Sequence, residues 1–197
     1  TVTDLVYDER RNLLWAAGWS SSTIRTIDLA TGDVTTIAGL PGVSGTTDGR
    51  ILRAPFDMEL IDDGSTLLVA DENEQRIYRF AVIDSHDGPT LAPPEPIAGR
   101  GGIGSPGATG AQALEARFRR LTGITTMPGG GIVIVDGGND QVSLLSDGRL
   151  FPVAVAGPIL RDGTRIEGDS IDSPLAVDYA AGFLWITQGG VLLRLDP

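Results

Sequence analysis

A pattern of short strands and glycine-rich turns recurs along the chain, and it constrains the fold more than any other feature of the sequence. Each copy has an apolar strand ending in a small or acidic residue, then a strand with alternating apolar positions, then a strand ending in an apolar residue, Ala and Gly. The first kind of strand occurs at residues 13–17, 67–71, 132–136 and 183–187, and the second at 23–27, 76–80, 141–145 and 191–195. The third ends at residues 37–39, 97–99 and 155–157. The copies are therefore spaced by about 60 to 65 residues.

These segments predict an all-β chain. Ile, Val, Leu and Trp alternating with Thr, Arg and Ser form the mixture that packs a pleated surface. The chain has 27 Gly and 12 Pro among its 197 residues, a density that interrupts long helices and favours turns. A sheet of four short strands cannot bury both faces by itself, so the copies must stack on one another. Repeats of this size, built from short strands, predict the blades of a β-propeller.

Two of the copies carry motifs that resemble the NHL-repeat family. The resemblance rests on Ile97-Ala98-Gly99 with Ala116-Arg117-Phe118 and Leu121-Thr122-Gly123-Ile124, on Ile37-Ala38-Gly39 with Thr47-Asp48-Gly49 and Ala54-Pro55-Phe56, and on the hairpins at 69–77 and 135–142. It covers nearly the whole chain, although the first and last copies lack the Asp that the family's hairpin has. The resemblance implies an NHL-type propeller, a ring that usually has six blades.

We expect a single propeller domain or propeller segment over residues 1–197, with blades at about 1–54, 55–116, 117–172 and 173–197. Three blades are complete with four strands, and the fourth stops after three strands. About four blades are fewer than six, so the sequence predicts a piece of a larger ring whose other blades come from the parent chain. The alternative is a small four-bladed ring that is open at one blade.

Charge and composition exclude several classes of function. The formal net charge is −11, all 15 cations are Arg, and no run of basic residues is longer than a pair. Because nucleic-acid binding depends on neutralising phosphates, we expect no nucleic-acid partner. The chain has no Cys, which excludes disulfides and thiolate chemistry. No apolar run approaches the ~20 residues of a membrane span. The family resemblance and the all-Arg composition suggest a bacterial, extracytoplasmic or secreted protein; the sequence holds no targeting signal that would establish this.

Three motifs imitate known sites. Residues 99–104 fit G-x-G-x-x-G, but the glycine run continues without a helix, so we expect an inter-blade loop and no dinucleotide site. Asp71, Asn73 and Gln75 imitate the start of a calcium loop, but they lack its later ligands, so we expect a turn in which side chains bond backbone amides. His86 is the single imidazole, in a proline-rich excursion at 83–96 that we expect to be exposed and without catalytic role.

Carboxylates at the start of two blades are the candidates for a metal site. Asp57 and Glu59 follow Phe56 on a first strand, and Asp178 occupies a similar place in the last blade. First strands line the central channel of a propeller, so these oxygens could hold Ca²⁺ at the channel mouth. The alternative is a set of rim charges paired across blades, which we favour because no Asn or His accompanies them.

The sequence favours a non-catalytic module that binds or scaffolds a protein, peptide or glycan, with no catalytic residue and no cofactor. NHL domains often act in this way, which is what the resemblance implies. Trp19, in a turn, is the candidate anchor for such a partner, unless it packs at a blade edge. The alternative is a metal-dependent propeller enzyme of the lactonase, hydrolase or lyase kind, with Ca²⁺ or Zn²⁺ at the channel mouth. The acidic loop at 161–172 is a further place where specificity could lie.

Overall fold

The computed structural model describes residues 1–40, 52–105, 107, 109–155, 160–161, 164–165 and 171–195. In this part of the chain all regular structure is β, except for one 3₁₀ turn, η1 (Ala113–Glu115). The chain divides into two compact units, Thr1–Ile97 and Ala98–Pro197, and each is described by itself. No helix in the described ranges has the length and apolar character that a membrane span requires.

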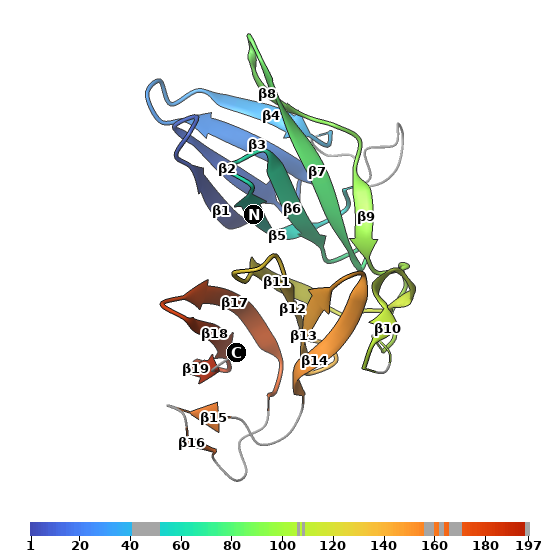
Figure 1. Ribbon diagram of the computed structural model, residues 1–197. Coiled ribbons are helices and arrows are strands. Elements are labelled where there is room, and N and C mark those ends of the chain that lie inside the picture. The colour runs from blue at the N-terminus through green and yellow to red at the C-terminus, as the bar shows by residue number, and fades with distance from the viewer. Residues whose placement is uncertain are drawn as a thin grey trace. The chain divides into compact units, whose positions relative to one another are not determined.

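The first unit contains two antiparallel sheets (Figure 1). The first sheet runs in chain order through β1 (Val2–Asp8), β2 (Leu13–Gly18), β3 (Thr23–Asp28) and β4 (Val34–Ala38). The second sheet runs through β5 (Pro55–Ile61), β6 (Thr66–Asp71) and β7 (Arg76–Ser85), and β7 then pairs with both β8 (Gly88–Leu91) and β9 (Glu95–Ala98). A meander in which every strand pairs with the one before it is the connectivity of a propeller blade.

The second unit repeats this connectivity. One sheet runs through β11 (Leu121–Thr126), β12 (Ile132–Asp136), β13 (Gln141–Ser146) and β14 (Arg149–Val155), with β10 (Ala111–Gln112) added at the edge of β14. The last sheet has three strands, β17 (Pro174–Ala180), β18 (Phe183–Gln188) and β19 (Val191–Leu195). A short pair, β15 (Leu160–Arg161) with β16 (Thr164–Arg165), precedes it.

Each unit has a core where one sheet packs on the next. In the first unit Trp15, Ala17 and Ile24 of the first sheet pack with Met58 and Val69 of the second. The equivalent cluster in the second unit contains the residues Val133, Val135, Val142, Val177, Leu184 and Ile186. These side chains alternate along their strands, so each sheet directs one face into the core, as the period of two predicts.

The four sheets have the architecture of four propeller blades, and the predicted all-β propeller fold is confirmed. The described residues therefore hold four blades, fewer than the six of the ring that the family resemblance implies. The strands predicted at 13–17, 23–27, 67–71, 132–136, 141–145, 183–187 and 191–195 are all present. The Thr47-Asp48-Gly49 motif and most of the loop at 161–172 lie outside the described residues.

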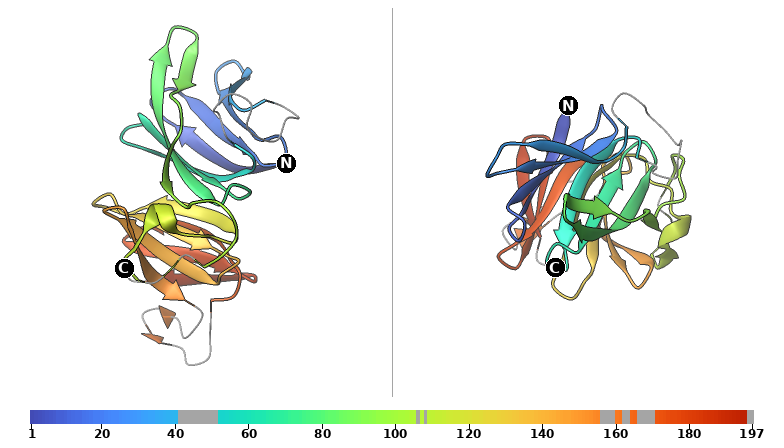
Figure 2. Two further views of the ribbon diagram at one scale, coloured as in Figure 1. Left: turned by 90° about the vertical axis from the view of Figure 1, so that its right-hand side faces the viewer. Right: turned by 90° about the horizontal axis from the view of Figure 1, so that it is seen from above.

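The second blade differs from expectation at the proline-rich excursion. Its third strand was predicted to end near Phe80, but β7 continues to Ser85 and pairs with β8, so most of the excursion is an ordered hairpin (Figure 2). The physical reason is the alternation at 81–83: Val82 is buried in the core of the first unit while Ala81 and Ile83 face outward. His86 lies in the exposed turn at the tip of this hairpin, as predicted.

Candidate functional site

The three predicted metal-site carboxylates lie in different units. Asp57 and Glu59 are half-buried on β5 in the first unit, whereas Asp178 is exposed on β17 in the second. Among the described residues, no group of three or more His, Cys, Asp or Glu side chains is arranged to hold a metal ion. The metal site at the channel mouth therefore stays a prediction.

A carboxyl pair that the sequence did not reveal lies beside one of these candidates. Asp4 on β1 accepts a hydrogen bond from the Met58 backbone amide at 2.9 Å, and its carboxyl is also hydrogen-bonded to that of Asp57. Burial raises the pKa of Asp4, opposed by the bonds from Met58, Leu5 and Asp57. Two carboxyl groups that interact directly do not titrate independently of each other.

A signal for the Asp4–Asp57 pair was present in the repeat. Both residues directly follow a bulge at the start of a first strand, Asp4 opposite Ala17 and Asp57 opposite Ala70. The two aspartates thus occupy the same position in consecutive blades, and packing of β1 on β5 brings them together. The weak similarity of the first blade to the repeat motif hid this equivalence.

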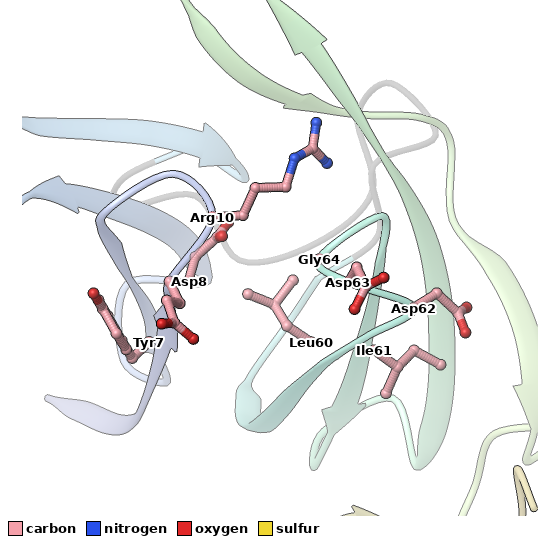
Figure 3. A pocket seen from close by; sticks show the side chains of 9 residues that line it. Tyr7, Asp8, Arg10, Leu60, Ile61, Asp62, Asp63 and Gly64 are labelled. Carbon is pink, nitrogen blue, oxygen red and sulfur yellow. The ribbon is translucent and has the colours of Figure 1, made fainter.

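An open groove of about 540 Å³ lies between the β1–β2 turn and the β5–β6 turn of the first unit. Its lining includes Leu60 and Ile61, and around them the charged residues Asp8, Glu9, Arg10, Asp62 and Asp63. Figure 3 shows Asp8 and Leu60 facing the gap between the two turns, while the ring of Tyr7 points to the other side of β1. The groove thus has one apolar side chain, Leu60, directed into it and a mainly acidic rim.

A buried arginine holds the two turns of the groove together. Arg11 Nη1 donates to Asp8 Oδ2 at 2.7 Å and to the Gly64 carbonyl at 2.9 Å, and Arg11 Nε donates to Asp84 Oδ1 at 2.7 Å. Trp15 Nε1 also donates to Asp8 Oδ2, at 3.2 Å. The network joins the first blade to the turn and to the extended hairpin of the second, so it fixes the width of the groove.

Some of the charged residues that line the groove form ion pairs, and others do not. Arg10 pairs with Asp84, and Arg11, followed by Arg10, holds the pKa of that carboxyl below its ordinary value. Asp8 is neutralised by Arg11. Glu9, Asp62 and Asp63 are exposed, and none of them forms an ion pair with another described residue. The free charge of the rim is therefore negative.

The calcium-like motif is a structural turn, as predicted. Asp71 is fully buried and accepts backbone hydrogen bonds from Arg53, Ala54, Asn73 and Glu74 at 2.6 to 3.1 Å. Burial raises its pKa in spite of these bonds. In the third blade Asp136 is engaged in the same way, by the amides of Arg119 and Arg120 and by the Asn139 side chain at 2.6 to 3.1 Å. Their oxygens already have partners, so the motif anchors the start of the second and third blades.

Trp19 and the glycine run at 99–104, two further candidates from the sequence, both have structural roles in the fold. Trp19 is 37% exposed, and its indole Nε1 donates to Glu72 Oε2 at 2.6 Å, which ties the first blade's turn to the second blade. Residues 101–104 of this run form bends, and the next regular elements in the described residues are the two-residue β10 and the single 3₁₀ turn. No α-helix follows this glycine run in the described residues, so the dinucleotide fingerprint lacks the helix it needs.

Comparison with known proteins supports the fold. No protein-family model matches the chain, and no curated protein sequence matches it significantly. Among solved structures it is similar to an auxiliary nutrient binding protein from Bacteroides thetaiotaomicron, with a TM-score of 0.66 and 16% identity over 91% of this chain and 43% of that one. It is also similar to a putative gluconolactonase, with a TM-score of 0.58 and 14% identity over 98% and 59% of the two chains.

A third similar structure is the β-propeller domain of Cps50 (Swd1) from Myceliophteria thermophila, with a TM-score of 0.57 and 13% identity over 100% of this chain and 54% of that one. Identities this low show the fold alone. The chain spans about two fifths to three fifths of the length of these three structures. The class that fold and comparisons define is therefore the β-propeller.

Proposed function

We propose that the protein is a non-catalytic, NHL-like propeller module that binds a protein or peptide segment bearing basic side chains. The observation that carries the proposal is the groove of the first unit, whose lining combines the exposed carboxylates Glu9, Asp62 and Asp63 with the apolar side chain of Leu60. A basic residue flanked by apolar ones complements such a surface, because its charge meets the acidic rim and an apolar neighbour can contact Leu60.

Two further observations support a binding role. The chain as a whole has a net charge of −11, which disfavours anionic ligands and favours cationic ones. One structurally similar protein is an auxiliary nutrient binding protein, which is a binding function on the same fold. The family resemblance of the sequence also implies an interaction module, of extracytoplasmic and bacterial kind.

The test is equilibrium binding of short peptides of matched length, in which Arg-Leu sequences are compared with Glu-Leu sequences by isothermal titration calorimetry. We expect binding of the Arg-Leu peptide only. Asp63→Asn and Glu9→Gln should each weaken it about tenfold, which corresponds to about 1.4 kcal/mol. Asp147→Asn, at an exposed turn of the second unit, is the matched control and should bind as the wild type does. Equal binding of both peptides, or binding of a neutral glycan instead, would refute the proposed ligand.

The second candidate is a metal-dependent enzyme, favoured by the Asp4–Asp57 carboxyl pair and by the similarity to a putative gluconolactonase. Carboxylate oxygens are the ligands that Ca²⁺ prefers. The Asp4–Asp57 pair, together with Glu59 on the same strand β5, would supply part of the ligand set of such a metal site. Thermal unfolding with chelator and then with Ca²⁺ or Zn²⁺ tests it. A ligand at a hundred times its Kd stabilises the native state by about 2.7 kcal/mol, so a bound metal would raise the midpoint visibly.

A further inference from the structure

A second pocket of the first unit lies between the β3–β4 hairpin of the first blade and the tip of the β7–β8 hairpin of the second. Its volume is about 210 Å³, and it shares no lining residue with the groove. The first blade lines it with residues of β2, β3, β4 and the β3–β4 turn, and the second blade with residues 87–89. β4 and β8 are in contact (Figure 1). The pocket therefore depends on the extension of β7 to Ser85, which places the hairpin tip against the first blade.

A buried hydroxyl without a hydrogen bond belongs to the lining of this pocket. Thr26 is 4% exposed and lies opposite Trp15 and Thr35 in the strand register, so its side chain is on the face of the sheet that packs on the second blade. Its hydroxyl forms no hydrogen bond with another described residue. Buried hydroxyl groups in native proteins are usually paired, and an exception calls for an explanation. The Thr26 hydroxyl is thus available to a molecule bound in the pocket.

The equivalent position in the third blade is apolar. Counting from the bulge of each first strand makes Thr26 equivalent to Leu144 on β13. Leu144 packs against the core of the second unit, where its side chain contributes to the contact between one sheet and the next. The repeat therefore accepts an apolar side chain at this position, and the packing of the blades does not require the hydroxyl of Thr26.

Three carboxylates, those of Asp28, Asp33 and Asp87, also line the pocket. Asp28 Oδ1 accepts hydrogen bonds from the amides of Ala30 and Thr31 at 2.7 and 3.0 Å, and Asp33 Oδ2 accepts one from the Thr31 hydroxyl at 2.9 Å. The turn thus holds both side chains in place and leaves each with a second oxygen for a ligand. None of the three aspartates forms an ion pair with another described residue, and no Arg or His lines the pocket.

We propose that this pocket binds an alkylguanidinium group. A guanidinium carries five N–H donors in a planar fork and is more weakly hydrated than an ammonium, so it suits a half-buried site lined by carboxylates. Its N–H groups donate to the aspartate oxygens and to the hydroxyl of Thr26. Its alkyl part contacts the apolar side chains that complete the lining, which are those of Leu13, Ile37 and Pro89.

The size of the pocket and the arrangement of its carboxylates favour this ligand over others. Sites for drug-sized molecules have volumes of about 300–1,000 Å³, so a pocket of about 210 Å³ takes one small group. A single metal ion does not fit, because no three acidic or His side chains of the described residues are arranged to hold one. An anion is disfavoured by the three carboxylates.

An NMR titration of the ¹⁵N-labelled protein with propylguanidinium tests the proposal. We expect shifts of the amide resonances of residues 26–28, 33–37 and 87–88, with millimolar affinity. Propylurea has nearly the same shape without the charge, and it should cause no shifts at these residues. The peptide acetyl-Gly-Arg-Gly-amide separates the two sources of the group. Equal or tighter binding of the peptide identifies an arginine side chain as the ligand, and weaker binding identifies a small molecule.

Two variants test the residues that carry the inference. Thr26→Val should weaken propylguanidinium binding about tenfold, because it removes an acceptor for a charged donor. It should not lower the melting temperature, because the hydroxyl has no partner in the described fold that the change would remove. Asp87→Asn should weaken binding by a similar factor, and circular dichroism verifies that both variants are folded. Asp147→Asn, in the second unit, is the matched control and should bind as the wild type does.

The proposal does not depend on the ligand of the groove, and the titration separates the two sites. Asp63→Asn changes the groove and should leave the shifts at residues 26–28, 33–37 and 87–88 unchanged. Propylguanidinium shifts confined to residues 7–10 and 60–64 would overturn the inference and leave the proposed function intact. Equal shifts with propylurea would also overturn it, as would an affinity that neither Thr26→Val nor Asp87→Asn changes.

Discussion

Arg11 and Asp8 form a buried ion pair, in which Arg11 Nη1 lies 2.7 Å from Asp8 Oδ2 and the side chains are 9% and 2% exposed. The pair lies within one turn of the first blade, yet the same guanidinium reaches the Gly64 carbonyl in the turn of the second. An interaction that is local in sequence thereby fixes the distance between two blades and the width of the groove between them.

Loss of Arg11 should destabilise the protein strongly. Arg11→Ala leaves the Asp8 carboxylate buried without a cation, with only the Trp15 indole and the backbone amide of residue 11 as donors. Breaking one partner of a buried pair typically costs about 3–5 kcal/mol. Urea unfolding monitored by circular dichroism measures the loss. Arg10→Ala is the control, because Arg10 is 52% exposed and surface pairs contribute about 0–1 kcal/mol. Equal effects of the two changes would contradict this description of the network.

Gly39 at the end of the first blade should not tolerate a side chain. Its φ is +82°, and a Cβ there would lie 1.9 Å from the Ser22 carbonyl oxygen. Gly32 has nearly the same φ, +80°, but open space around its Cβ position. Gly32→Ala should therefore cost about 1–2 kcal/mol from the left-handed backbone alone. Gly39→Ala should cost roughly 1–3 kcal/mol more from overpacking. Thermal unfolding of the two variants compares them directly, and equal midpoints would refute the clash.

The Asp4–Asp57 pair should make stability depend on pH in a defined direction. Burial raises the folded-state pKa of Asp4 above its ordinary value of 3.8, so between these two values the folded state binds more protons than the unfolded state. Stability from this group therefore rises as pH falls through the raised pKa toward 3.8, and ionisation at neutral pH is unfavourable. Asp4→Asn keeps an acceptor for the Met58 amide and should raise the melting temperature at pH 7.

The advantage of Asp4→Asn should shrink as the pH is lowered toward 4, because the wild-type carboxyl then becomes neutral. Melting temperatures of both proteins from pH 7 to pH 4 provide the measurement, with Asp147→Asn as an exposed control. A variant that is less stable than wild type at pH 7, with no change in the difference at lower pH, would show that the Asp4 carboxylate is favourable in the fold.

Asp71 should be essential to the second blade for a reason unrelated to calcium. Asp71→Ala removes the acceptor of four backbone amides, and leaving buried donors unpaired should cost on the order of 3 kcal/mol. Asp71→Asn keeps one oxygen and should lose less. Calcium should not shift the melting temperature of the wild type through this turn, and a shift that Asp71→Asn abolishes would make the turn a metal site after all.

The sequence predicts the strands well because each obeys a local rule. The alternation at 23–27 and 141–145 and the apolar strands at 67–71 and 132–136 mark both the faces and the ends of strands. Asp71 and Asp136 were assigned to turns for the same reason, since their partners lie within about 20 residues. The extension of β7 to Ser85 was missed because the prolines and charges of 83–96 outweighed the short alternation around Val82.

The groove and the carboxyl pair depend on contacts between blades, which no local pattern encodes. Asp4 and Asp57 are 53 residues apart, as are Arg11 and Gly64. Finding either pair requires the exact register of two repeats, the first of which is degenerate, including the bulges at the starts of β1 and β5. Asp57 was identified as a candidate from its place on a first strand, whereas its partner Asp4 could be found only by aligning that strand with the first one.

Binding at the acidic groove is the central claim, and its most direct test is an NMR titration of the ¹⁵N-labelled protein with the Arg-Leu peptide. We expect shifts of amide resonances at residues 7–10 and 60–64, which line the groove, and loss of those shifts in Asp63→Asn. Peptide-induced shifts confined to other residues, or no shifts at millimolar peptide, would contradict the claim that this groove is the binding site.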